Sequence, residues 1–223
     1  AQVAGIEKTQ EHIHRLTTIK DANRIFLIDS RMKASDQLSQ EPAYMAVANF
    51  RLLAPTGEAY AEPFLETDLA AKRPVRFLIS ELWHETAAGT PPPEDGAIRR
   101  FEHRQGDTVL GSLVAVAGVA ESITAEELEK VTMAKFEANG IFRKEGPDLL
   151  SQYSRPDGTA ELLARVWRVD RDGVALSLLS AQITLHGVPV ALTMLSPSPE
   201  NEMELWAINR RAFDIAVNSL HPG

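Results

Sequence analysis

The sequence predicts an α+β fold in which an antiparallel β-sheet, arranged as a meander, is covered by helices. Residues 160–196 alternate in side-chain type with the period of two that is expected for strands with one buried face. Two tight turns divide this stretch into three strands. After residue 200 the apolar residues recur at the 3.6-residue spacing of an amphipathic helix. Consecutive strands followed by a helix indicate an α+β architecture rather than alternating parallel units.

The turns of the meander are identified by residues that accept a left-handed backbone. Asp170-Arg171-Asp172-Gly173 combines an aspartate at the first position with a closing glycine, and His186-Gly187 forms the second turn. Pro197 and Pro199 end the third strand, because proline cannot donate a hydrogen bond to a neighbouring strand.

The closing helix is expected to begin near residue 200, with Ser198 or Asn201 as its cap. We expect its apolar stripe to lie on the sheet, because each large apolar side chain removed from water contributes about 1.5 to 3 kcal/mol. The predicted buried positions are Leu205, Ile208, Ala212, Ile215 and Ser219, flanked by Trp206, Phe213 and Val217. The predicted exposed positions are Asn209, Arg210 and Asp214.

The first hundred residues have less regular patterns. The expected elements are a short helix or irregular arm over 1–20, a strand over 24–32, a helix or polar loop over 35–48, a strand over 44–53, one or two helical turns within 63–73 and a strand over 75–83. Pro42 argues against an uninterrupted helix through 35–48, because proline breaks the helical hydrogen-bond pattern.

Residues 87–96 contain three consecutive prolines and two glycines, so an extended loop is predicted there. The length of the chain suits one α+β domain over 1–223. The loop could divide it into N-terminal strands within 1–86 and a strand–helix–meander–helix unit within 97–223.

A buried strand and a helix are predicted between this loop and the meander. Residues 108–120 are small or branched apolar residues, with glycines that suggest close backbone approach. Thr124 and Glu127 form a capping box, which predicts the start of a helix, and Asn139-Gly140 predicts its C-terminal end. The predicted inner face of this helix consists of Leu128, Val131, Ala134 and Ala138.

Composition excludes several classes of function. The chain has no cysteine, which excludes disulfides, zinc–thiolate sites, iron–sulfur clusters and thiol nucleophiles. Its net charge of −8 argues against nucleic-acid binding, because phosphate contacts need clustered lysine and arginine. No apolar run approaches the ~18 residues of a membrane span. We therefore predict no nucleic-acid partner and no transmembrane segment.

The groups that best match the needs of acid–base catalysis are Glu102, His103 and Asp107, which follow the proline-rich loop together with Arg100 and Arg104. A charged strand edge that faces water would show the same pattern. The residues are therefore candidates for catalysis whose alternative role is solvation of an edge.

No metal or cofactor site is predicted. His12 and His14 lack a matched third ligand, and His84-Glu85 is followed by Ala88 where a zincin helix needs a second histidine. The calcium-loop pattern that begins at Asp170 is cut short by Gly173, which favours a turn. Glycine-rich phosphate loops, dinucleotide fingerprints and nucleophile elbows are absent from the sequence. The tryptophans could line a ligand pocket or, as is usual on strands and helices, belong to the core: Trp83, Trp167 and Trp206.

The order of elements after the loop resembles that of the PsbP-like proteins. The resemblance covers residues of about 100–220 and rests on the strand near Thr108, the helix that begins Ile-Thr-Ala-Glu-Glu-Leu, the two turns, and Phe213 to Ser219 in the closing helix. That group includes the photosystem II lumenal subunit, a Ran-binding nuclear import factor and periplasmic proteins of the DcrB type. The spacing from Phe213 to Ser219 differs from theirs, and Leu220-His221-Pro222-Gly223 replaces the usual aromatic tail. The resemblance implies an antiparallel sheet flanked by helices and used mainly to bind partners.

We therefore expect a non-catalytic, exported bacterial protein with a binding or accessory role. A chain that begins Ala1-Gln2-Val3-Ala4 is typical of the end left after signal-peptide removal, although a trimmed chain would look the same. The expected location is periplasmic or secreted. Two alternatives stay open: a hydrolase or lyase with its site near Glu102, His103 and Asp107, and a carrier of a lipophilic ligand held between sheet and helix.

Overall fold

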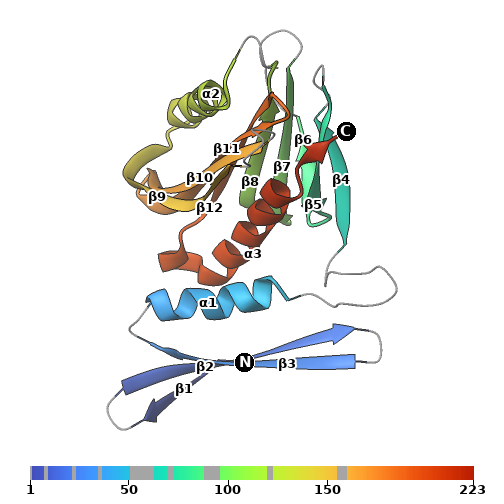
Figure 1. The fold of residues 1–223 in the computed structure, drawn as a ribbon. Helices are drawn as coiled ribbons and strands as arrows, with labels where there is room; N and C mark the ends of the chain where they lie inside the picture. The colour runs from blue at the N-terminus through green and yellow to red at the C-terminus, as the bar shows by residue number, and fades with distance from the viewer. Residues whose placement is uncertain are drawn as a thin grey trace.

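A computed structural model describes residues 2–7, 10–21, 24–34, 37–50, 63–69, 73–87, 96–119, 123–154 and 160–223. These residues form three antiparallel sheets and three α-helices, which confirms the predicted α+β class (Figure 1). Most of the predicted proline-rich loop, residues 88–95, lies outside the described residues. None of the described helices has the length and apolar character needed to cross a bilayer.

The largest sheet has seven strands in the order β6-β7-β8-β12-β11-β10-β9. It consists of two meanders that meet where β8 and β12 pair, so the predicted single meander is only part of it. Its strands are β6 (Trp83–Thr86), β7 (Ala97–Gln105), β8 (Thr108–Ala117), β9 (Phe142–Ser154), β10 (Ala160–Arg171), β11 (Val174–Leu185) and β12 (Val188–Pro197). Asp172, Gly173, His186 and Gly187 have φ values of 53°, 80°, 48° and 79°, which confirms both predicted turns.

Helices cover both faces of this sheet. Leu192 of β12 belongs to the same core cluster as Phe213 of α3 (Pro199–Asn218). The next residue back, Ala191, is clustered instead with Leu128 of α2 (Ala125–Ala138). Neighbouring strand residues point to opposite faces, so α3 and α2 lie on opposite sides of β12. A second sheet, with the order β13-β5-β4, contributes Phe77 to the α3 side, where its ring meets Phe101 edge-on at 6.0 Å.

The second sheet corrects two predictions. Residues 63–73 were expected to form helical turns, but they contain the strand β4 (Phe64–Leu69). The strand expected over 75–83 divides at a turn into β5 (Val75–Ser80) and β6. β5 pairs on one side with β4 and on the other with the short C-terminal strand β13 (His221–Pro222). The pairing of β5 with β13 joins residues that are distant in sequence, which local patterns do not report.

The N-terminal region forms a third sheet, order β1-β2-β3, covered by α1 (Figure 1). Its strands are β1 (Gln2–Glu7), β2 (Gln10–Asp21) and β3 (Arg24–Lys33). The helix or irregular arm predicted over 1–20 is therefore wrong, whereas the strand predicted over 24–32 is confirmed. α1 (Gln37–Ala48) lies between this sheet and α3. The strand predicted over 44–53 is wrong for its described part, because Tyr44 lies in α1.

Pro42 lies inside α1 and does not end it. Its side chain is exposed, so its ring faces away from the contacts that α1 makes with β3 and α3. Contacts on both sides of a helix can outweigh the unfavourable propensity of a single residue. This explains why the argument from Pro42 against a helix was wrong.

The buried faces of α2 and α3 include polar residues that the apolar pattern placed outside. In α2 the buried positions are Ala125, Leu128, Glu129, Thr132 and Met133, whereas Val131, Ala134 and Ala138 of the predicted inner face are exposed. In α3 Asn209 is fully buried, although it was predicted to face solvent. Both corrections have the same cause, because polar groups of the sheet provide partners for Glu129 and Asn209.

The predicted capping box of α2 is present, and its removal should destabilise the protein. The Thr124 hydroxyl accepts a hydrogen bond from the Glu127 backbone at 3.2 Å, and the Glu127 carboxylate accepts one from the Thr124 backbone at 2.7 Å. We expect Thr124→Ala to lower the free energy of unfolding by about 1 kcal/mol, measured by urea denaturation. Thr124→Ser keeps the hydroxyl and should stay close to the wild type. Equal losses in the two variants would contradict a capping role.

The same cap makes a contribution that depends on pH. Hydrogen bonds from the backbone and hydroxyl of Thr124 lower the pKa of Glu127. A carboxyl whose pKa is lowered on folding stabilises the folded state above its unfolded pKa of about 4.3. That stabilisation is lost as the pH falls through the lowered pKa of the folded state.

Candidate functional site

The structure does not bring the three predicted acid–base residues together. Glu102 and His103 are neighbours on β7, so their side chains point to opposite faces of the sheet. The Glu102 carboxylate is buried and accepts hydrogen bonds from Arg100 at 2.8 Å and from Arg104 at 2.7 Å. Asp107 lies in the exposed turn between β7 and β8. The three side chains therefore do not converge on one point.

His103 belongs to a buried polar network with α3. Its Nδ1 lies 3.1 Å from Oδ1 of Asn209, and its ring centroid is 5.7 Å from that of Trp83. The Asn209 amide donates to the Leu110 carbonyl at 2.8 Å and to the Ser196 hydroxyl at 3.0 Å. Because both amide hydrogens are used in this way, Oδ1 is left to accept, and the His103 proton lies on Nδ1. This network connects β7, β8, β12 and α3.

The remaining sequence candidates are placed as follows. Trp83, Trp167 and Trp206 are all buried and do not line one shared pocket, although Trp167 also forms part of a cavity wall described below. Asp170 accepts a hydrogen bond from the Gly173 backbone at 3.1 Å, which confirms the turn. Within the part of the chain that the structure describes, no three His, Cys, Asp or Glu side chains are arranged to hold a metal ion.

The structure places a different set of charged residues between α2 and the sheet, and Glu129 is at its centre. Glu129 is 5% exposed and accepts three hydrogen bonds from sheet residues. The donors are Arg165 of β10 at 2.5 Å, and Ser180 and Gln182 of β11 at 2.5 and 2.6 Å. A buried carboxylate is tolerated only when it is paired and hydrogen-bonded, and Glu129 meets both conditions. It anchors the middle of α2 to two strands.

Arg165, the cation of this buried pair, is partly exposed to solvent. Its side chain is 23% exposed, and its guanidinium carbon lies 5.2 Å from the ring centroid of Trp167. Its Nη2 donates to Glu129, but its Nε is buried and has no hydrogen-bond partner among the described residues. An unsatisfied buried donor costs about 1 to 3 kcal/mol, so a native one calls for an explanation.

Two adjoining cavities open beside this pair. One has a volume of about 520 Å³ and the other about 550 Å³, and they share Glu126, Leu163 and Gln182 in their walls. Arg165 and Trp167 line the first, whereas the second is lined by side chains that include Thr124, Gln152, Tyr153, Glu161 and Thr184. Helix α2 forms one wall, and strands β9 to β11 form the other. We call these two cavities together the α2 groove.

Six of the charged side chains that line the α2 groove form three ion pairs, and Glu161 of β10 adds a further carboxylate. Besides Glu129 and Arg165, Glu126 contacts Lys130 at 2.8 Å and Glu137 contacts Arg143 at 2.5 Å. The hydrogen bond and charge of Lys130 lower the pKa of Glu126, and those of Glu126 raise the pKa of Lys130. The Glu126 carboxylate is thus held in its charged form by Lys130. The arrangement suits the recognition of a polar ligand better than the transfer of a proton.

Sequence reasoning missed Glu129, although a signal for it exists. Leu128 was predicted to be buried, and Thr132 and Met133 follow it at helical spacing, which places Glu129 on the same stripe. Arg165 lies on the same face of β10 as Leu163 and Trp167, because the three residues are two positions apart. A carboxylate on the buried stripe of a helix and a cation on a half-buried strand together indicate a buried pair.

Comparisons with known proteins support a fold resemblance only. No family model matches the chain, and no curated protein matches it. The structure is similar to the solution structure of cyanobacterial PsbP from Synechocystis sp. PCC 6803, with 16% identity, coverage of 77% of this chain and 99% of that chain, and a TM-score of 0.47. The apo structure of the immunity protein TplEi of T6SS from Pseudomonas aeruginosa has 12% identity, covers 96% of this chain and 68% of that chain, and has a TM-score of 0.27. A PsbP protein, from the group that the sequence resembles, is thus among the similar solved structures.

Proposed function

We propose that the protein is a non-catalytic binding protein whose α2 groove takes an extended polypeptide segment of a partner. The observation that carries this proposal is the buried Glu129–Arg165 pair in the wall of an open groove. Buried ion pairs contribute little net stability compared with apolar residues of similar volume. The placement of this pair beside an open groove favours a role in recognition.

The lining of the α2 groove matches the chemistry of a polypeptide. Each peptide unit presents one donor and one acceptor, and the amide groups of Gln152 and Gln182 provide both. The buried Nε of Arg165 is a donor that a small shift of the side chain would turn toward a peptide carbonyl or a carboxylate. Met133 and Leu163 provide apolar contacts between these polar groups. A mixed lining of this kind favours a peptide over a purely apolar ligand.

The neighbouring edge of the sheet is less suited to bind a partner strand. β9 is the last strand of the sheet, and Pro147 within it cannot donate a hydrogen bond. The register between β9 and β10 also shifts at three places. Irregularities of this kind discourage the addition of a further strand. The proposal therefore concerns the groove beside α2 rather than the free edge of β9.

A selection from a phage-displayed library of random dodecapeptides tests the proposal. We expect selected peptides to bind the wild type and to lose at least about tenfold in Kd, or about 1.4 kcal/mol, with Ala134→Trp, which fills the groove. Arg165→Met should weaken the same peptides. Val174→Trp is the matched control, because Val174 is exposed outside the groove. Peptides that bind Ala134→Trp as tightly as the wild type, or no selected peptides at all, would contradict the proposal.

Export and an accessory role remain predictions of the sequence. The separation of periplasmic, cytosolic and secreted fractions from expressing bacterial cells tests the location directly. We expect the protein in the periplasmic or the secreted fraction. Recovery with the cytosolic markers alone would show that this prediction is wrong.

A further inference from the structure

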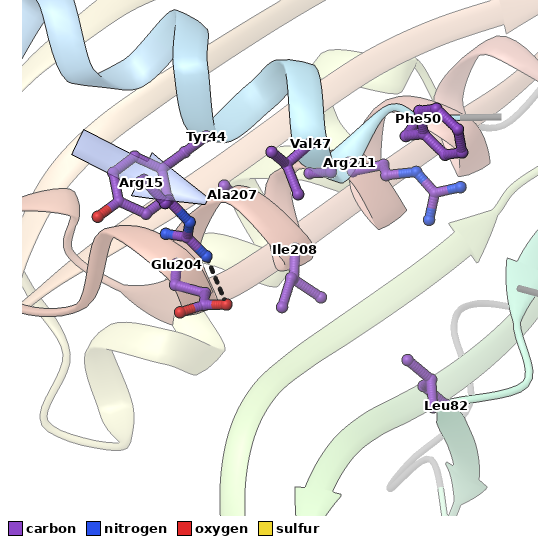
Figure 2. A pocket seen from close by; sticks show the side chains of 10 residues that line it. Arg15, Tyr44, Val47, Phe50, Leu82, Glu204, Ala207, Ile208 and Arg211 are labelled. Atoms are coloured by element: carbon purple, nitrogen blue, oxygen red, sulfur yellow. Dashed lines mark hydrogen bonds and ion pairs between the residues drawn. The ribbon is translucent and has the colours of Figure 1, made fainter. Parts of the chain in front are cut away.

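A cavity of about 230 Å³ lies between α1 and α3, and one end of it is closed by a formed ion pair (Figure 2). Arg15 of β2 donates to the Glu204 carboxylate at 2.8 Å, and its guanidinium carbon lies 4.3 Å from the ring centroid of Tyr44. Figure 2 shows these three side chains together, with Val47 and Ile208 beyond them. Because Arg15 and Glu204 neutralise each other, this pair leaves no charge that would select a ligand.

The second cavity of the α2 groove, with a volume of about 550 Å³, contains a carboxylate without a cation. The other carboxylates of the groove are each paired: Glu126 with Lys130, Glu129 with Arg165, and Glu137 with Arg143. Glu161 of β10 is exposed, and among the described residues no cation forms an ion pair with it. Glu161 and Glu126 are the only charged side chains among the described residues that line this cavity. The cavity is therefore complementary to a cation.

The strand register places a hydroxyl group on each side of Glu161. Glu161 is paired with Ser154 of β9 and with Thr184 of β11, and all three residues line the cavity. Paired residues of neighbouring strands lie on the same face of a sheet, with the strands about 4.8 Å apart. The carboxylate and the two hydroxyls thus form a row of hydrogen-bond acceptors. An ammonium group has three donors, which match these three acceptors.

The next row along the strands suits the stem of a basic side chain. Leu163 lies between Gln152 of β9 and Gln182 of β11, and these three residues also line the cavity. Leu163 is two residues from Glu161, about 7 Å along the strand, which is close to the reach of the four-carbon lysine stem. Basic side chains lay their stems on apolar surface and keep the charged end at polar partners. Tyr153, which is 45% exposed, adds an aromatic ring to the lining, and such rings attract cations.

We propose that this second cavity selects a lysine or arginine side chain of the partner segment, with its cation at Glu161 and its stem on Leu163. This selection rests on the proposed binding of a polypeptide in the α2 groove, and it names the residue type by which the segment is recognised. Glu161 forms a new ion pair with the ligand, and no ion pair of the groove has to break. The first cavity, in which the described charges balance, then holds the neighbouring part of the segment.

NMR titration of the full chain with three capped amino acids tests the pocket without a selected peptide. The probes are the Nα-acetyl N-methylamides of lysine, norleucine and glutamate, and norleucine has the lysine stem without the ammonium group. We expect lysine to bind with a Kd on the order of 1 mM, at least about tenfold more tightly than norleucine, and glutamate to bind most weakly. The lysine probe should shift the amide resonances of Glu161 and Thr184. Equal binding of lysine and norleucine, or no saturable shift with lysine, would overturn the proposal.

One variant and one control locate the charge that attracts lysine. Glu161→Gln keeps the size of the side chain and should weaken the lysine probe at least about tenfold while leaving the norleucine probe unchanged. Asp148→Asn is the matched control, because it removes the same charge from an exposed position of β9 outside the described lining of both cavities. It should leave all three probes unchanged. Equal weakening of lysine in the two variants would assign the effect to overall charge and overturn the pocket.

Peptides selected by the α2 groove provide a second test. We expect replacement of a lysine or arginine in a selected peptide by norleucine to weaken binding to the wild type at least about tenfold, and to change binding to Glu161→Gln little. Peptides that are lost with Ala134→Trp but bind Glu161→Gln as tightly as the wild type would overturn the pocket and leave the peptide function in place. A library that yields no peptides would contradict the proposed function, and the capped lysine would still report on Glu161.

Discussion

Replacement of Glu129 by alanine is expected to lower the free energy of unfolding by about 3 kcal/mol, because it leaves Arg165 and Ser180 without their buried partner. Removal of one member of a buried pair costs about 3 to 5 kcal/mol. We expect the lower end of this energy range because 23% of the Arg165 side chain is exposed to solvent. Equilibrium unfolding in urea measures the change.

Two further variants distinguish the loss of stability caused by breaking the buried pair from the general effect of removing a charge. Glu126→Ala removes a carboxylate from the same helix. Because the ion pair of Glu126 with Lys130 is exposed, the urea concentration at the midpoint of unfolding should hardly change. The double variant Glu129→Met with Arg165→Met removes both charges and should recover at least half of the loss. A double variant less stable than Glu129→Ala would show that the pair itself is not the source of the effect.

Replacement of Asn209 by alanine is expected to cost a similar amount, about 3 kcal/mol. The substitution leaves the His103 ring nitrogen, the Leu110 carbonyl and the Ser196 hydroxyl without their shared partner. Each buried group that is left unsatisfied costs about 1 to 3 kcal/mol, and the side chain of Asn209 is fully buried. Urea denaturation gives the size of the loss.

The matched control for this prediction is Asn218→Ala. Asn218 also lies on α3 and donates to a backbone carbonyl, that of Asp214 at 2.7 Å, but it is exposed. Its replacement should cost about 0.5 kcal/mol or less. Nitrogen NMR of the histidine ring provides a second readout, because Asn209→Ala removes the acceptor that keeps the His103 proton on Nδ1. Unchanged His103 resonances would contradict the network as described.

The elements that the sequence predicted correctly depend on interactions between near neighbours. The turn at Asp172-Gly173 requires residues that tolerate positive φ, and both residues adopt it. The start of α2 depends on a reciprocal bond between Thr124 and Glu127, which are three positions apart. The sequence shows such features directly because all of the participating atoms lie within a few residues.

The incorrect elements depend on the strands and helices that they pair with or pack against, rather than on the pattern of their own residues. β4 is a strand because it pairs with β5 and packs beside the large sheet, and residues 2–7 and 10–21 are strands because they pair with each other. α1 tolerates Pro42 because it lies between β3 and α3. The residue pattern of each segment taken by itself does not show these partners.

The candidate site predicted from the sequence differs from the one in the structure because tertiary packing decides which side chains meet. Glu102 and His103 are adjacent in sequence, but the alternation of β7 sends them to opposite faces, one to paired arginines and the other to Asn209. Glu129 and Arg165 are 36 positions apart, and only the packing of α2 on β10 brings them into contact. Sequence proximity therefore suggested one cluster, and tertiary packing produced another.

The sequence by itself determined the α+β class, the turns of the meander, the helix after Thr124 and the absence of cysteine chemistry, because propensity, capping and composition are local properties. The tertiary structure alone decided the three-sheet arrangement, the burial of Glu129 and Asn209, and the positions of the cavities beside α2 and α3. Burial of a polar residue depends on the partners that the opposing element offers, and a cavity depends on side chains from several elements. Arg211 illustrates this, since α3 carries it but α1 and the residues around Leu82 complete the cavity that it lines.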